Sequence, residues 1–501
     1  MSRINTNVGS LLSQRILRTN NNSLTKSLER LSTGLAINRG ADNPAGLIAS
    51  EALRSEKAAI MAAIGNAERA DQVINIAEGG LQEINSLLME LQGLVGQSAN
   101  DAGLSIEERE ANQLQIDSIL QTIDRIAAST SFQGTKLLNG TYDFTVSAQS
   151  SFVADLEVNA AKMNFDENRE VQVLITKSAQ RAGLFLSLGG AQLDLSSSES
   201  KFIFEIAGAQ GSRQFTFASG TTLESMRDAI NTFTQVTGVS AATSGTGLVL
   251  KSTEFGSSQF VSVKMVSDGE QAGGIHLLSS TNENAANTAA VTAFAAAVTG
   301  SDVRDSGQDV GAIINGITAT AKGKVARINT DFLDVKIELT TSGAQTLHAI
   351  DAFTITGGGA KFNLGPNVDI GNQVSIGIQN VAARNLGTLS TGYLDELGSS
   401  RAANVVDGDI SKAQKIVNAA INQISSLRGR LGAFQKNVIG STINSLGVAL
   451  ENTSAAESAI RDTDFANETA QLTRSQILVN AATNVLAMAN SQPQSVLALL
   501  G

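Results

Sequence analysis

ERLSTGLAINRGADNPAGLIASE at residues 29–51 and ENTSAAESAIRDTDFANETAQLTRSQILVNAATNVLAMANSQPQSVLALLG at residues 451–501 decide the fold of this chain. Both stretches are helical in pattern and carry apolar residues on one side. Long terminal helices without a compact core of their own must bury their apolar stripes against each other or against other copies of the chain. The sequence therefore predicts two chain ends that fold as parts of one structure.

The outermost helices are expected from apolar residues that recur every three or four positions over residues 4–35, with the polar NNNS at 20–23 as a weak point. In the last stretch the apolar residues repeat every seven positions, and Pro493 is expected to end the helix. These stripes predict a self-assembly surface on the inner helices. Its expected residues are Leu24, Leu28, Leu31, Leu35, Phe465, Leu472, Val479 and Leu486.

The clearest periodicity lies between these ends, where residues 45–98 alternate apolar spacings of three and four. Asn43-Pro44 is a typical helix start, and at about 1.5 Å per residue the helix would be roughly 80 Å long. A second helix should end near Ser131, and residues 410–438 form another stripe that includes Val438. The expected coiled-coil positions of this rod are Ile74, Leu81, Ile84, Leu88, Leu91, Ile424, Leu427, Leu431 and Phe434.

The middle of the chain, residues 143–360, changes to short β-type runs bounded by Gly and Ser, such as KFIFEIAG at 201–208. One helix is expected among them, with a capping box of Thr221 and Glu224. Residues 284–300, NAANTAAVTAFAAAVTG, are low in complexity, which predicts a link between two small β-rich units.

The composition and charge of the chain exclude several classes of site and partner. The chain has 501 residues, a net charge of -11, 3 Pro, 2 Tyr, no Trp and no Cys. The acidic charge argues against nucleic acid as the main partner, and the absence of Cys excludes disulfides and thiolate metal sites. No apolar run reaches about 18 residues, so no transmembrane helix is expected. The N-terminus does not resemble a cleaved signal peptide.

Catalytic motifs are missing from the sequence. Only His276 and His348 are present, and neither belongs to an HExxH motif. Gly357-Gly358-Gly359 reads as a turn, and Asp462-Thr463-Asp464 as a helix cap, because one DxD lacks the other ligands of a calcium loop. We therefore expect no enzyme activity, no cofactor, no metal site and no bound nucleic acid.

The quoted ends also resemble a known family. ERLSTGL and DNPAGL at the front, with RLGAFQ, ENTSAAESAIRDTDFA and NSQPQSVLALLG at the back, closely resemble bacterial flagellin over residues 1–140 and 361–501. FQGTKLLNG at 132–140 and LGPNVDIGNQVSIGIQNVAARNLG at 364–387 resemble the β-hairpin region of its rod domain. Residues 200–263 are similar to an insert module of flagellins and hook proteins.

The resemblance, together with the stripes, predicts a multidomain fold. All-α coiled-coil or helical-bundle inner and rod domains would be formed by both termini, with β-rich (α+β) outer domains inserted between them. The expected inner domain is 1–43 with 456–501, and the expected rod domain, long helices plus a β-hairpin, is 44–142 with 361–455. The two outer domains are expected at 143–283, which includes the insert module, and at 284–360.

The resemblance implies a structural subunit that polymerises into the extracellular flagellar filament for swimming motility. It implies export without a cleaved signal peptide, and an inner domain that is disordered in the free subunit and lines the central channel of the filament. The implied partners are other copies of the chain, an export chaperone, the flagellar secretion apparatus, and the filament cap and hook–filament junction proteins. No membrane partner is expected.

Members of the family that an animal Toll-like receptor detects usually carry Arg, Leu and Glu on a rod surface. The matching positions here are Glu90, Leu94 and Gln115. An acid in place of the Arg would turn an attractive contact repulsive, so receptor recognition is not expected.

Two other functions stay open at the level of sequence. A hook–filament junction protein shares parts of both termini, although NSQPQSVLALLG and the intact ERLSTGL favour the filament subunit. Copy number would separate the two. A flagellin with an enzymatic insert is disfavoured by the missing HExxH motif.

Overall fold

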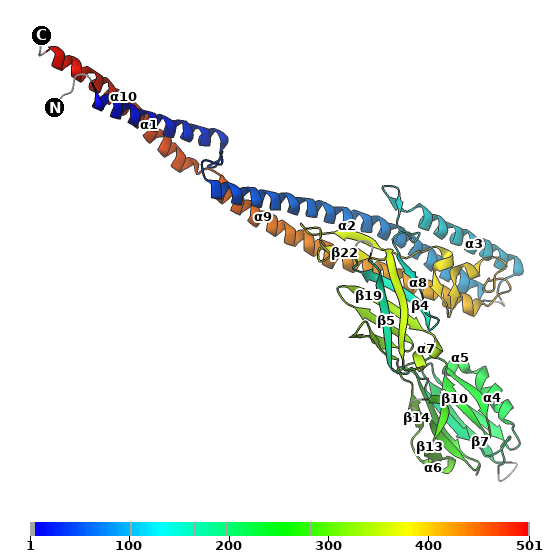
Figure 1. Ribbon diagram of the computed structural model, residues 1–501. Helices are drawn as coiled ribbons and strands as arrows, with labels where there is room; N and C mark the ends of the chain where they lie inside the picture. Colours follow the sequence, from blue (N-terminus) through cyan, green and yellow to red (C-terminus); the bar gives the residue numbers. More distant parts are fainter. Residues whose placement is uncertain (1–5, 101–102, 165–166, 196–198, 280–281, 499–501) are drawn as a thin grey trace. The chain divides into compact units, whose positions relative to one another are not determined.

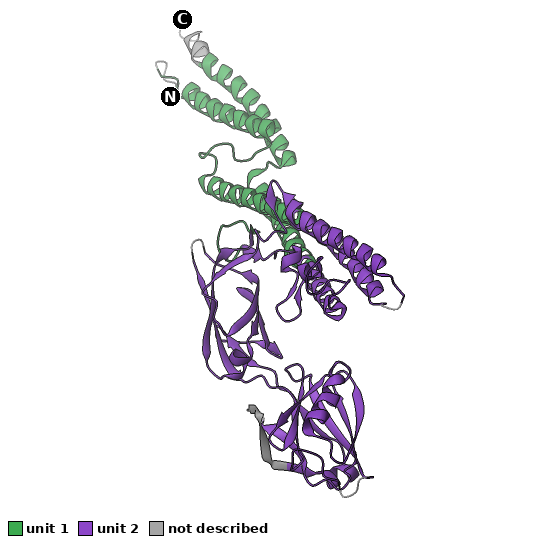
Figure 2. Cartoon of the chain, turned by 90° about the vertical axis from the view of Figure 1, so that its right-hand side faces the viewer, with its two compact units in different colours: residues 1–72, 362–372, 432–501 green, residues 73–361, 373–431 purple. Residues whose placement is uncertain are grey.

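The computed structural model describes residues 6–100, 103–164, 167–195, 199–279 and 282–498, without the side chains of residues 282–290 and 493–498. Long helices form both ends of the chain, and strands form its middle (Figure 1). This confirms the predicted fold class. The chain divides into two compact units: unit 1 is residues 1–72, 362–372 and 432–501, and unit 2 is residues 73–361 and 373–431 (Figure 2).

Helix α1 (Val8–Thr33) is continuous, so the predicted weak point at residues 20–23 is wrong. Asn20 lies toward α10 (Phe465–Ala498) and donates from its side chain to the carbonyl of Leu478 at 3.3 Å. Packing against α10 therefore outweighs the modest helix propensity of the asparagines. Gly34, in the left-handed conformation at φ 73°, ends the helix.

The predicted long helix is confirmed as α2 (Pro44–Ser98), 55 residues long, with Asn43 accepting from the Gly46 amide at 3.0 Å. Helix α3 (Ile106–Ser129) starts at a capping box formed by Ser105 and Glu108. Within unit 2, α2 runs antiparallel to α8 (Ile410–Ala433). Two bonds fix their register: Arg428 Nε lies 2.7 Å from Glu78 Oε1, and Gln92 Nε2 donates to Asn418 Oδ1 at 2.8 Å.

A π-helical segment, η3 (Phe434–Gly440), joins α8 to α9 (Ser441–Arg461). The buried stripe of α8 steps by three and four up to Phe434, and the next buried residue is Ile439, five positions later. A wider π turn absorbs this extra residue and keeps Leu446 on the same stripe. The expected burial of Val438 is therefore wrong, and Ile439 takes its place.

Helix α10 continues to Ala498, so the prediction that Pro493 ends it is also wrong. A proline inside a helix leaves the carbonyl four residues earlier without its donor. That carbonyl belongs to Ala489, and it accepts a hydrogen bond from the Asn7 side chain at 2.7 Å. No helix in the described part of the chain has the length and hydropathy needed to cross a membrane.

The β-rich middle contains two sandwiches, each made of a five-stranded and a four-stranded antiparallel sheet. In sandwich 1 the sheet orders are β16-β15-β5-β20-β3 and β17-β18-β19-β4. Its core includes Val171, Ile337 and Phe353. Its strands are β3 (Phe144–Ser147), β4 (Val153–Ala161), β5 (Arg169–Lys177), β15 (Gly311–Ile314), β16 (Ile317–Thr318), β17 (Thr320–Lys322), β18 (Val325–Asn329), β19 (Leu333–Leu339) and β20 (Ala349–Gly358).

In sandwich 2 the sheet orders are β13-β12-β6-β10-β9 and β14-β11-β7-β8. Strand β7 alternates buried and less buried positions, as the predicted period of two requires. Its core includes Phe202, Phe204 and Phe294. Its strands are β6 (Gly183–Ser187), β7 (Lys201–Gly208), β8 (Ser212–Ala218), β9 (Val239–Ser244), β10 (Gly247–Ser252), β11 (Phe260–Ser267), β12 (Gly274–Ser279), β13 (Asn282–Ala293) and β14 (Val303–Ser306).

Residues 284–300 are not the expected link. They belong to β13, which pairs with β12, and to α6 (Phe294–Thr299), which buries Phe294 in sandwich 2. As a result the two cores do not divide the chain at residue 283: sandwich 2, residues 182–306, is inserted into sandwich 1. The expected helix is present as α4 (Leu223–Thr232), but its cap is Thr222 bonded to the Ser225 amide.

Short elements complete the chain. They are α5 (Thr234–Thr237), α7 (Thr341–Gln345), η1 (Ala383–Asn385), η2 (Leu394–Leu397), β1 (Ser131–Phe132), β2 (Thr135–Lys136), β21 (Ala360–Asn363), β22 (Gln373–Ile376), β23 (Gly387–Thr388) and β24 (Gly392–Tyr393).

Candidate assembly surface

Unit 1 places α1 and α10 side by side as an antiparallel pair (Figure 1). Backbone bonds align the segments that lead into them: Ala36 N donates to Arg461 O at 2.7 Å, and Thr463 N donates to Gly34 O at 2.9 Å. Asp464 then caps α10 by accepting from the Ala466 and Asn467 amides. The two chain ends are therefore held in a fixed register.

The seam between α1 and α10 buries small residues. Its most buried positions are Ser10, Ser13, Ser27, Ser475 and Ala482, all between 3 and 8% exposed. The Ser10 hydroxyl donates to Asn490 Oδ1 at 2.7 Å across this seam. Small side chains let the helices approach closely, but they remove little apolar surface from water. The small residues of the seam by themselves therefore stabilise this pair only weakly.

Large apolar side chains lie on the outward faces of the same pair. Val8 is 63% exposed, Ile477 62% and Met488 64%, which is the reverse of an ordinary helical hairpin. The outward row, as we name it, consists of Val8, Leu11, Leu12, Ile16, Leu28, Phe465, Ile477, Leu478, Val485 and Met488. A row of this kind is expected to be covered by another protein surface.

The eight residues predicted for self-assembly divide between these two surfaces. Leu28 and Phe465 are exposed and belong to the outward row. The half-buried ones are Leu24, Leu31, Leu35, Leu472, Val479 and Leu486. On α10, the seven-residue repeat predicts only the stripe of Phe465, Leu472, Val479 and Leu486. The outward residues Leu478, Val485 and Met488 also recur at spacings of seven and three, and that second stripe was the signal available in the sequence.

The nine predicted rod positions are all buried, at 8% exposure or less. Eight of them lie in unit 2, on α2 and α8, and Phe434 lies in unit 1 near Phe362, with ring centroids 6.3 Å apart. Farther along unit 1, Lys57 bonds Glu457 at 3.2 Å between α2 and α9. The rod helices therefore cover their own predicted stripes, whereas the outward row of α1 and α10 is uncovered.

Comparison with known proteins agrees with this architecture. The family model "Bacterial flagellin N-terminal helical region" matches residues 4–143, and "Bacterial flagellin C-terminal helical region" matches residues 414–500. The chain belongs to the bacterial flagellin family. A third model, "Flagellin hook IN motif", matches residues 202–254, inside sandwich 2.

Curated flagellins align with the chain from end to end. Flagellin B of Helicobacter pylori is 28% identical over 535 residues, and the flagellin of Salmonella choleraesuis is 29% identical over 525 residues. Each alignment covers 99% of this chain and 99% of the relative. Among solved structures, FliC from Burkholderia pseudomallei is 14% identical, with a TM-score of 0.21, and covers 73% of this chain and 99% of its own.

The positions that match the receptor-binding residues of some flagellins lie on α2 and α3. Gln115 Nε2 donates to Glu90 Oε1 at 3.2 Å, and both residues are exposed. Leu94 is only 7% exposed. The structure therefore brings Glu90 and Gln115 together on this surface but buries Leu94.

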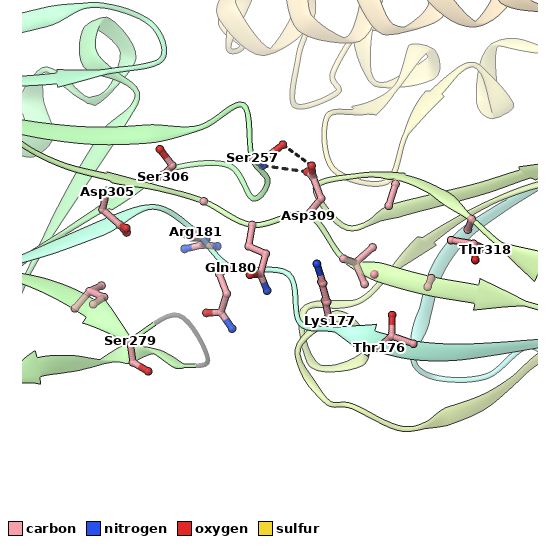
Figure 3. A pocket seen from close by; sticks show the side chains of 18 residues that line it. Thr176, Lys177, Gln180, Arg181, Ser257, Ser279, Asp305, Ser306, Asp309 and Thr318 are labelled. Carbon is pink, nitrogen blue, oxygen red and sulfur yellow. Dashed lines mark hydrogen bonds between the residues drawn. The ribbon is translucent and has the colours of Figure 1, made fainter.

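Unit 2 also contains a hollow of about 570 Å³ where the two sandwiches join (Figure 3). Asp309 accepts hydrogen bonds there from the amides of Ser257 and Gly323, and so ties a loop of sandwich 2 to the β17–β18 turn. Among the residues that the structure describes, no group of three His, Asp or Glu side chains could hold a metal ion. The hydrogen bonds of Asp309 therefore help to hold the two sandwiches together.

Proposed function

We propose that the chain is the subunit that polymerises into the extracellular flagellar filament, and that the outward row of α1 and α10 is the surface through which copies bind each other. This proposal rests on the way that α1 and α10 pack. Serines occupy the most buried positions between the two helices, whereas the large apolar residues Val8, Ile477 and Met488 are exposed. Full burial of one such side chain contributes about 1.5–3 kcal/mol.

The half-buried stripe has a different role in this proposal. Leu472, Val479 and Leu486 face the seam and help α10 to pack on α1, which shapes the outward row without contacting the next copy directly. The pair has too little buried surface to offset the backbone ordering entropy, about 1–2 kcal/mol per residue. The inner ends of the free subunit should therefore order fully only on assembly.

The other expected partners follow from membership in the family. We infer that the subunit is exported without a cleaved signal peptide, with the help of an export chaperone and the flagellar secretion apparatus, and adds beneath a filament cap above hook–filament junction proteins. The protein is inferred to be structural, without enzymatic activity. Recognition by the animal receptor is disfavoured, because Glu90 replaces the arginine and Leu94 is buried.

A hook–filament junction protein is the alternative. It would share the helical ends but would add in a limited number of copies rather than elongate without limit. The relatives named above are flagellins matched over 99% of their length. Counting copies along isolated flagella separates the two functions.

Seeded elongation tests the assembly surface. Leu478→Ala combined with Val485→Ala removes two outward residues, and we expect the critical concentration to rise at least tenfold, which corresponds to about 1.4 kcal/mol. The matched control is Val266→Ala with Leu347→Ala, two exposed apolar residues of unit 2, which should leave elongation unchanged. Equal critical concentrations for the two variants would place the subunit contacts elsewhere.

A further inference from the structure

The paired chain ends carry charge of one sign. Residues 1–28 and 469–501 contain no Asp or Glu, although the whole chain has a net charge of -11. Their charged side chains are Arg3, Arg15, Arg18, Lys26 and Arg474. Lys26 bonds Asp42 at 2.8 Å. Among the described residues, the exposed Arg15, Arg18 and Arg474 have no acidic partner.

The remaining part of unit 1 carries the opposite surplus. Its basic residues are largely used in pairs such as Lys57 with Glu457 and Arg461 with Glu51. Glu56 on α2 and Glu451 on α9 are exposed and have no basic partner within the described part of the chain. One unit therefore presents a cationic surface on α1 and α10 and an acidic surface on α2 and α9.

These charges restrict how two copies can meet. A two-fold contact between identical outward faces would bring two cationic surfaces together, and like charges repel. A contact between two different surfaces of the chain avoids this repulsion. Contacts of that kind produce an open helical polymer whenever the rotation between neighbouring copies does not close a ring.

We propose that the cationic surface of α1 and α10, defined by Arg15, Arg18 and Arg474, binds the acidic surface of a neighbouring copy, defined by Glu56 and Glu451. This inference rests on the proposed assembly function and adds the pairing that gives the polymer its direction. The outward apolar row supplies most of the binding free energy, whereas the charges select which face it meets.

A basic amphipathic helix also has the chemistry of a helix that lies on an anionic lipid surface. A second copy is the better match, because the chain itself provides the complementary acids and belongs to a family of self-assembling subunits. The lipid alternative becomes an outcome of the test. Wild type and Arg15→Gln/Arg18→Gln are compared for co-sedimentation with anionic phosphatidylserine vesicles and for elongation of filament seeds.

The proposal expects Arg15→Gln with Arg18→Gln to raise the critical concentration about tenfold at low salt, about 1.4 kcal/mol. The difference from wild type should shrink as NaCl shortens the screening length from about 10 Å at 0.1 M to about 3 Å at 1 M. The matched control, Arg384→Gln with Lys264→Gln, removes two exposed unit 2 charges and should behave as wild type. A variant that loses only vesicle binding and elongates normally overturns the proposal.

Charge exchange gives the second measurement. Arg15→Glu with Arg18→Glu should abolish elongation, as should Glu56→Lys with Glu451→Lys, while the chain that carries all four changes should elongate its own seeds again. If the chain with all four changes melts like wild type but does not elongate, the proposed pairing is wrong. If its melting temperature falls, the Arg15→Gln with Arg18→Gln variant provides the test instead, because it removes the charges without reversing them. Wild type that fails to elongate seeds would instead contradict the proposed function.

Discussion

The side-chain amide of Asn7 donates a 2.7 Å hydrogen bond to the main-chain carbonyl of Ala489, 482 residues further along the chain. Pro493 leaves this carbonyl without its helical donor. The same asparagine accepts from the Ser10 amide at 3.0 Å and so caps α1. The Asn7 side chain thus caps α1 and also supplies the hydrogen-bond donor that α10 lacks at Ala489, which links the two ends of the chain.

The first prediction separates these two roles. Asn7→Asp keeps the acceptor that caps α1 but removes the donor, leaving the Ala489 carbonyl unpaired. We expect the filament to lose stability, by about 1–3 kcal/mol for each buried group left unsatisfied. Thermal dissociation of filaments measures the loss. The matched background is Pro493→Ala, which restores the amide donor, so in that background Asn7→Asp should have little effect. If Asn7→Asp lowers filament stability equally with and without Pro493→Ala, Asn7 does not compensate for the missing amide donor of Pro493.

The second prediction concerns the π-helical segment. Deleting exposed Asn437 removes the extra residue, so the segment can become an α-helix with Ile439 and Leu446 still on the buried stripe. We expect the free chain to keep its melting temperature. The control is deletion of exposed Ser425 from regular α8, which rotates Leu427 and Leu431 off the stripe and should lower the melting temperature strongly. Equal losses in both deletions would contradict this account.

The third prediction is a pH dependence in unit 2. Burial raises the pKa of Asp143 from 3.8 to about 6, more strongly than the nearby Arg430 lowers it. Because the folded-state pKa is raised, the charged carboxylate destabilises the fold above about pH 6, and this penalty fades as the pH falls toward 3.8. Asp143→Asn should therefore stabilise strands β3 and β4 at about pH 7.5 and match wild type near pH 4.

Hydrogen exchange of the β3 and β4 amides measures this difference. Glu157→Gln is the contrasting variant, because Glu157 bonds Arg430 at 3.0 Å and its neutralisation removes this ion pair from a largely buried guanidinium. It should destabilise the same strands at neutral pH. A constant gap between Asp143→Asn and wild type at all pH values would exclude titration of Asp143 as the cause.

The fourth prediction concerns the inserted sandwiches. Ser147 and Thr354 are register partners of β3 and β20, so residues 148–353 can be replaced by a short flexible turn that closes a hairpin. Polymerisation should be preserved, because the outward row and the predicted rod stripes lie outside the deleted segment. Electron microscopy of seeded filaments checks this outcome. A soluble deletion variant with intact helices that cannot elongate seeds would show that the sandwiches carry essential contacts.

Much of the fold could be predicted because its signals are local. The apolar spacings of three and four predicted α2 and α8, and the alternation of KFIFEIAG predicted β7. The rod positions Ile74 and Leu431 were predicted by period alone, and both are fully buried. These signals depend only on which side of a helix or strand a residue occupies.

Other features depended on residues far apart in sequence. The helix propensities of residues 20–23 and of Pro493 predicted a weak point and an end, but contacts with Leu478 and Asn7 override both. The Ala- and Thr-rich stretch at 284–300 looked like a link, and pairing with β12 makes part of it a strand. Local propensity amounts to less than about 1 kcal/mol for an ordinary residue and to about 3 kcal/mol for a proline, so tertiary contacts can reverse it.

The sequence by itself determined the helical ends, the β-rich middle, the resemblance to flagellin and the absence of Cys. Only the tertiary structure decided which apolar stripe of α10 faces α1 and which faces outward. Both stripes have helical spacing, and the sequence alone cannot rank them. The buried serines of the seam decide the matter: Ser13 and Ser475 allow the helices to approach closely, which turns Leu478 and Val485 away from α1. Close packing of small side chains, rather than hydrophobicity alone, thus selects the surface that is left for assembly.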